Sequence, residues 1–189
     1  MIKMKKIISF ALAVVLLIAL TACSRNSTDI EVYTKYAQED KYLPVLEELG
    51  EYASVQSLYH HDSALIFFWD AYNLIVGYDE LQYEQAKAAV EERYTFTEDI
   101  IHSSIEGPHD EWELVDYPPS CDLYGYHMRI LDTNGYTFPK DVYLVGTNDD
   151  SHRIAYVRFY DIDLDSVESL ESFLLDECGW SELKKRDML

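Results

Sequence analysis

The alternation of apolar and polar residues in the second half of the chain is the pattern that most constrains its fold. Residues 124–130 alternate between apolar side chains and polar side chains or glycine, which predicts a half-buried strand. Asn134 and Gly135 form a hairpin turn signal, and apolar stretches follow at 142–145 and 154–160, with turn residues 148–151 between them. This order predicts a meander of antiparallel strands.

The first half predicts a β-hairpin. A stretch over 54–60 leads into two apolar runs at 64–69 and 74–78, with the expected turn at 70–73 between the two runs. Before them, Pro44 and Gly50 stand where a short helix commonly begins and ends.

Two amphipathic helices are predicted, one after each group of strands. Asp79 with Gln82 is typical of a helix start, and so is Asp165 with Glu168. The apolar stripe of the first helix is Tyr83, Ala86, Val90 and Tyr94, and that of the second is Val167, Leu170, Leu174 and Cys178. We therefore expect an α+β fold in which an antiparallel sheet, a hairpin plus a meander, carries helices on one face.

The first 22 residues have the layout of a secretory signal peptide. Three lysines precede an apolar run over residues 7–20, followed by small residues. The run has 14 residues, fewer than the roughly 18–20 needed to cross the hydrocarbon of a membrane. The segment Leu20-Thr21-Ala22-Cys23 resembles the lipobox of bacterial lipoproteins. This resemblance implies cleavage before Cys23, lipid on its thiol, and a location on the extracytoplasmic face of the cell membrane.

The domain organisation follows from this signal. We expect a signal peptide over 1–22, a lipidated flexible tether over 23–40, where no periodicity is sustained, and a single domain over 41–189. Without the signal, 12 of the 15 basic residues remain against 35 acidic ones, a formal charge of −23. Such a charge disfavours nucleic acid and anionic lipid head groups, and it favours a cationic peptide, a basic protein or a divalent metal, although it also serves solubility alone. A cell-wall component is an alternative partner.

Two cysteines, Cys121 and Cys178, remain after Cys23. An extracytoplasmic location permits them to form a disulfide. Because Cys178 falls on the apolar stripe of a predicted helix, a buried free thiol is the alternative.

Two groups of residues suggest a metal site. His102, Glu106 and His109 lie in a stretch predicted to be irregular and carry nitrogen and oxygen donors that suit zinc, and residues 60–62 read His-His-Asp. A solvated polar loop is the alternative for the first group. Residues 161–165 resemble the start of a calcium-binding loop, but Ser166 and Ser172 replace the glycine and the glutamate that such a loop requires.

Aromatic residues are the strongest sign of a recognition surface. The chain has 16 tyrosines and three tryptophans, which bind partners with little loss of entropy. Tyr156 and Tyr160 share the strand face opposite the apolar residues 155, 157 and 159, which predicts exposure. Trp112 lies among acidic residues. It is either a contact residue for a cationic partner or a residue that packs its loop onto the domain.

The end of the chain is similar to small uncharacterised lipoproteins of Gram-positive bacteria. The segments that carry this similarity are Tyr160-Asp161-Ile162-Asp163 and Cys178-Gly179-Trp180. It implies a location and a type of domain, but no activity.

These patterns favour a lipid-anchored, extracytoplasmic, acidic binding or interaction protein. The sequence has no nucleophile elbow and no glycine-rich phosphate or dinucleotide loop, so no catalytic residue and no cofactor are assigned. Two alternatives remain: a metal-dependent hydrolase of the cell envelope that uses His102, Glu106 and His109, and an inhibitor or immunity protein for a basic enzyme.

Overall fold

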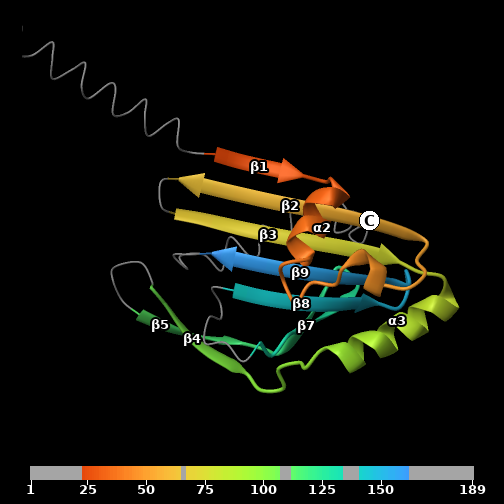
Figure 1. Cartoon of the computed structure of the whole chain (residues 1–189). Coiled ribbons are helices and arrows are strands. Elements are labelled where there is room, and N and C mark those ends of the chain that lie inside the picture. Colours follow the sequence, from red (N-terminus) through yellow and green to blue (C-terminus); the bar gives the residue numbers. More distant parts are fainter. Residues whose placement is uncertain (1–22, 65–66, 107–111, 134–140, 162–189) are drawn as a thin grey trace, which may run out of the picture.

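The computed structural model describes residues 23–64, 67–106, 112–133 and 141–161. Within these residues, seven strands form one antiparallel sheet in the order β1-β2-β3-β9-β8-β7-β6, and β4 pairs with β5 separately (Figure 1). The strands are β1 (Cys23–Ser27), β2 (Ser54–Ala64), β3 (Phe67–Gly77), β4 (Ile101–Glu106), β5 (Trp112–Tyr117), β6 (Ser120–Leu123), β7 (Tyr126–Ile130), β8 (Asp141–Asn148) and β9 (Arg153–Asp161). The helices are α2 (Ile30–Ala37), the 3₁₀ helix η1 (Leu46–Glu48) and α3 (Glu80–Arg93). The predicted α+β class is confirmed.

The predicted hairpin exists, but its turn was placed wrongly. β3 continues through residues 70–73, and its register with β2 runs unbroken from Ser54↔Gly77 to Ala64↔Phe67. β3 is a central strand between β2 and β9, so Ala71, Tyr72 and Asn73 are all buried within the sheet. A segment that resembles a turn in composition is therefore part of the core.

The predicted meander is confirmed for β7, β8 and β9. In β7, buried Tyr126, Met128 and Ile130 alternate with more exposed residues. Tyr124 was expected to begin this strand, but it lies in a two-residue turn with Gly125, where both residues have positive φ. Two positive φ values in succession are typical of the type I′ hairpin turn. The turn at 134–135 and the helix expected after residue 165 lie outside the described residues.

The segment predicted to be a flexible tether contains β1 and α2, so that prediction is wrong. β1 pairs with β2 over five residues, from Cys23↔Ser63 to Ser27↔Tyr59. Asp29 caps α2, because its carboxylate accepts a hydrogen bond from the backbone N–H of Glu31 at 3.0 Å. Tyr33 and Ala37, one helical turn apart, are buried against the sheet.

Helix α3 follows β3 as predicted. Tyr83, Val90 and Tyr94 of the expected stripe are buried, and Ala86 is partly buried. Asp79 is the N-cap residue, but its side chain makes no capping hydrogen bond. The helix predicted from Pro44 is shorter than expected: only the 3₁₀ turn η1 forms before Gly50.

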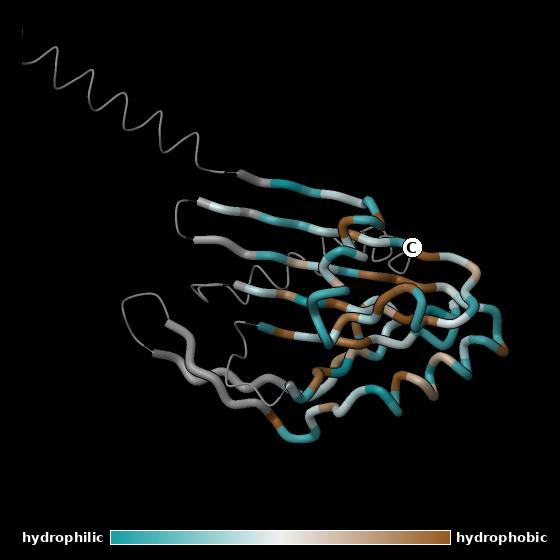
Figure 2. Tube along the Cα trace, in the orientation of Figure 1, coloured by the Kyte–Doolittle hydropathy of each residue, from teal (hydrophilic) through white to brown (hydrophobic). Residues whose placement is uncertain are grey.

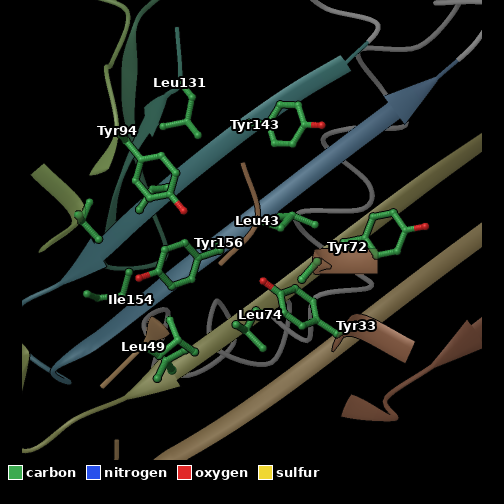
Figure 3. Packing of buried hydrophobic residues seen from close by; sticks show 14 of the residues in the cluster. Tyr33, Leu43, Leu49, Tyr72, Leu74, Tyr94, Leu131, Tyr143, Ile154 and Tyr156 are labelled. Atoms are coloured by element: carbon green, nitrogen blue, oxygen red, sulfur yellow. The ribbon is translucent and has the colours of Figure 1, made fainter. Parts of the chain in front are cut away.

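Both faces of the sheet are buried. One cluster joins α2 and α3 to alternate residues of the central strands, among them Leu74, Val76 and Tyr156 (Figure 3). The second cluster includes Ala155, Val157 and Phe159, which confirms their shared face. The two helices therefore lie on the same side of the sheet. Apolar segments gather along the central strands, whereas the trace of α3 is mainly hydrophilic (Figure 2).

Within the described part of the chain, no helix combines the length and the apolar composition needed to cross a membrane.

Candidate functional site

A groove of about 460 Å³ lies between α3 and the segment that contains η1. This volume falls within the range typical of small-ligand sites. The groove is lined by Glu48, Leu49, Gly50, Glu51, Leu81, Gln82, Gln85, Ala86 and Ala89. The described lining includes no histidine, cysteine, serine or lysine, and such a composition suits binding rather than nucleophilic chemistry.

Small residues create the groove. Ala86 and Ala89 are three residues apart on α3, so they share a helix face that carries no side chain beyond Cβ. On the opposite wall Gly50 has φ +71°, which lets the chain turn after η1, and no atom lies within 4 Å of the position that a Cβ would take. The space between the two elements therefore stays open.

The wall formed by η1 is fixed by an ion pair. Arg93 of α3 donates a hydrogen bond to the carboxylate of Glu48, which also accepts one from the backbone N–H of Val45 at 3.3 Å. The bond from Arg93 is the main cause that lowers the pKa of Glu48 below its ordinary value. Arg93 balances the charge of Glu48, and the exposed carboxylate of Glu51 makes the groove as a whole negative.

A smaller pocket of about 40 Å³ shares Glu48, Leu49, Ala86 and Ala89 with the groove. It is large enough to hold a water molecule. Tyr78 lines it, and burial raises the pKa of this tyrosine to about 12. Gln82, in the main groove, has a buried Oε1 atom that accepts no hydrogen bond in the described part of the protein.

Leu81 adds an apolar contact surface. It lies in the first turn of α3, lines the groove, and is 70% exposed, the largest value among the exposed large apolar residues of the described chain. An apolar side chain that remains in water gains free energy when a partner covers it. The groove thus combines an exposed leucine with a net negative charge.

Tyr156, one of the predicted contact residues, is not exposed. It is 4% accessible and packs in the cluster that α2 and α3 cover, with its ring centroid 6.4 Å from that of Tyr94. The prediction failed because these helices cover the face of β9 that was expected to be free. Tyr160 is half-buried, and the guanidinium of Arg158 lies 5.8 Å from its ring centroid. Trp112 pairs with Glu106 at the start of β5.

The structure gives the backbone position of two of the three predicted metal ligands. His102 and Glu106 lie on one extended strand, β4, and four residues of strand separate their Cα atoms by about 13 Å. His109 lies outside the described residues, so the metal site stays a prediction. Among the described residues, no group of three histidine, cysteine or acidic side chains is arranged to hold a metal ion.

The two histidines in residues 60–62 lie in different environments. His60 is buried, whereas His61 is half-buried and lies 2.6 Å from Asp70 through its Nδ1 atom. Neighbouring strand residues face opposite sides of the sheet, which is why the pair is divided.

The proposed disulfide stays a prediction. Cys121 is exposed on β6, and Cys178 lies outside the described residues.

A polar network at the other end of the central strands was not anticipated. Arg158 donates two hydrogen bonds to Asp141, at 3.0 and 3.3 Å, and lies 3.6 Å from Asp40. Burial lowers the pKa of Arg158, but the hydrogen bonds and charges of these carboxylates outweigh it and leave the pKa raised. This network joins the loop after α2 to the sheet, and its members satisfy one another.

No family model matches the chain, and neither the curated proteins nor the solved structures contain a significant match.

Proposed function

We propose that this protein is a lipid-anchored, extracytoplasmic binding protein whose groove between η1 and α3 takes a short cationic segment of a partner peptide or protein. The observation that carries the proposal is the composition of the groove, which pairs the exposed Leu81 with the carboxylate of Glu51. The chain around it is strongly acidic, with a formal net charge of −20.

Each feature of the groove suits one part of such a ligand. A basic side chain approaches Glu51, and an apolar side chain covers Leu81. An acidic field speeds the approach of a cationic partner and makes the association sensitive to salt. An inhibitor or immunity role toward a basic enzyme is one form of this function.

The location rests on the lipobox-like segment that ends at Cys23. Replacing Cys23 by alanine should abolish incorporation of labelled fatty acid and leave uncleaved precursor, because the lipid needs the thiol. Cells that express the wild-type chain serve as the control. Unchanged lipid labelling of Cys23→Ala would overturn the anchor.

The groove is tested with a charge reversal. A dye-labelled peptide of alternating lysine and leucine is titrated with Glu51→Arg and with the control Glu98→Arg, which makes the same change at an exposed site outside the groove. We expect Glu51→Arg to weaken binding about tenfold, equivalent to about 1.4 kcal/mol, and Glu98→Arg to change it little. Wild-type binding should also weaken as salt rises.

If Glu51→Arg and Glu98→Arg weaken peptide binding equally, the affinity depends only on the overall charge of the protein. That result would contradict the groove as the binding site. Crosslinking on intact cells then identifies the natural partner, with an anchor-only protein as the background.

A further inference from the structure

We propose that β6, an edge strand of the sheet, is a contact surface for a second copy of this chain, and that two β6 strands pair antiparallel about Cys121. The strand order ends at β6, which has β7 on one side only. An edge strand presents unpaired backbone N–H and C=O groups, and a strand of another molecule can pair with them. This inference goes beyond the groove and depends neither on the groove nor on the lipid anchor.

The register of β6 with β7 shows which backbone groups of β6 face outward. The backbone N–H of Ile130 donates to the carbonyl oxygen of Pro119 at 3.0 Å. Hydrogen-bonded pairs alternate along an antiparallel ladder, so Cys121, two residues further along, also bonds to β7. The N–H and C=O groups of Ser120 and Asp122 therefore point away from β7. Within the described residues, no backbone hydrogen bond joins these outward groups to another segment.

The middle of β6 is also accessible at its side chains. Cys121 and Asp122 are exposed, whereas the residues at the two ends of the strand are partly buried. The side chain of Asp122 is 86% exposed, although its carboxylate lies 2.8 Å from the Nδ1 atom of His127. In the described part of the protein, β6 is thus open to solvent where a second strand would pair.

Charge and backbone geometry select one pairing of two copies. With the two-fold axis at Cys121, Ser120 of each copy pairs with Asp122 of the other, so the outward N–H and C=O groups of both residues are used. An axis at Asp122 would place two carboxylates directly opposite each other, which is destabilising. An axis at Ser120 would place Pro118, which has no N–H, opposite Asp122. The edge is therefore self-complementary about Cys121, as a two-fold interface requires.

This register brings the two Cys121 residues together. They form a non-hydrogen-bonded pair, in which the Cα atoms are about 4.5 Å apart. A disulfide needs a Cα separation of about 4.4–6.8 Å. Two copies of residue 120, or of residue 122, are offset by two residues along the strands, so their Cα atoms are about 8 Å apart, too far for a disulfide. Thiol crosslinking therefore reports the register directly.

Oxidation of single-cysteine variants tests the pairing. The full chain, carrying Cys23→Ser and Cys178→Ser and kept in detergent, is treated with the diazene oxidant diamide. The pH is mildly alkaline, because burial and the charge of Asp122 raise the pKa of the Cys121 thiol. One S–S bond forms and two S–H bonds break, and the diazene takes up both protons and both electrons. Matched variants move the cysteine by one residue, combining Cys121→Ser with Ser120→Cys or with Asp122→Cys. We expect them to form disulfide dimers about tenfold more slowly than Cys121 does.

Two substitutions of one residue test the backbone contact without an oxidant. Asp122→Pro removes the outward N–H but no hydrogen bond to β7, whereas Asp122→Ala removes the same carboxylate and keeps the N–H. In reducing buffer, we expect light scattering to give a dimer for the wild type and for Asp122→Ala, and a monomer for Asp122→Pro. Circular dichroism checks that all three are folded, and if Asp122→Pro is not, the crosslinking rates decide.

Three results would overturn the pairing. Equal crosslinking rates of the three single-cysteine proteins would show random collision, and a monomeric wild type would show that the edge stays unpaired. A disulfide between Cys121 and Cys178 in the monomer band of a non-reducing gel, identified by mass spectrometry of the protein with its native cysteines, would show that Cys121 faces its own chain. None of these results bears on the lipid at Cys23 or on peptide binding in the groove, which have their own tests.

Discussion

Tyrosine hydroxyls of α2, β8 and the end of α3 join the buried core to the loop that follows α2. Tyr33 donates to the carbonyl oxygen of Pro44 at 2.9 Å, and Tyr143 donates to the carboxylate of Asp40 at 2.8 Å. Tyr94 makes a similar bond, at 3.1 Å, to the carbonyl oxygen of residue 42. The rings are buried while their hydroxyls reach polar loop atoms, so one residue type supplies both packing and loop attachment. This loop leads directly into η1 and the groove.

Removing one of these hydroxyls should measure the attachment. Tyr33→Phe keeps the ring but leaves the carbonyl of Pro44 without its donor, and we expect a loss of about 1–2 kcal/mol in the free energy of unfolding. Urea unfolding followed by circular dichroism measures it. Tyr52→Phe, at a side chain that is 38% exposed, is the control and should change stability by less than about 0.5 kcal/mol. Equal losses in the free energy of unfolding of the two variants would show that the hydrogen bond from Tyr33 to Pro44 does not stabilise the fold.

At the scale of elements, the β6–β7 turn depends on Gly125. Its φ is +80°, and a Cβ there would lie 2.9 Å from the Nδ2 atom of Asn148. Gly50 has a similar φ, +71°, without any atom within 4 Å of a new Cβ. Gly50→Ala therefore adds backbone strain alone, whereas Gly125→Ala adds strain and a collision.

We expect Gly50→Ala to cost about 1–2 kcal/mol and Gly125→Ala to cost more, measured by thermal or urea unfolding of both variants. The comparison is matched, because the residue change and the backbone region are the same. A smaller loss at Gly125 than at Gly50 would show that Asn148 moves aside freely.

The elements that were predicted correctly are those with a long, regular pattern. β7 and β9 alternate over several residues, and the stripe of α3 spans more than three turns, so local periodicity determined them. α2 is only eight residues long, so its apolar face, which includes Tyr33 and Ala37, spans little more than two turns and is easily missed in the sequence. The turn expected at 70–73 failed because a central strand, buried on both faces, need not alternate in polarity.

The groove could not be predicted from the sequence for a different reason. Gly50 and Ala86 contribute by being small, and they meet only after η1 and α3 have packed together. No motif marks such an empty space. The exposed Leu81 also fits an ordinary amphipathic pattern, and only its accessibility shows that nothing covers it.

At the scale of the whole molecule, the sheet has a tyrosine-rich core on its helix-covered face. Tyr33, Tyr94, Tyr143 and Tyr156 are all buried there, and burial is the largest cause that raises the pKa of each. Burial disfavours the charged phenolate. The folded protein therefore keeps these hydroxyls protonated at a pH at which the unfolded chain has released its protons.

This difference predicts that alkali unfolds the protein. A group whose pKa is raised by folding contributes stability below its unfolded value, ordinarily 10.0, and that contribution is lost as pH rises toward the folded value, about 12 for Tyr78. Between these values each such tyrosine lowers the free energy of unfolding by about 1.4 kcal/mol per pH unit. Tyr78→Phe should make the slope shallower by that amount, measured by urea unfolding across a pH series, with tyrosinate absorbance reporting ionisation. An unchanged slope would show that Tyr78 ionises as readily in the folded protein as in the unfolded chain.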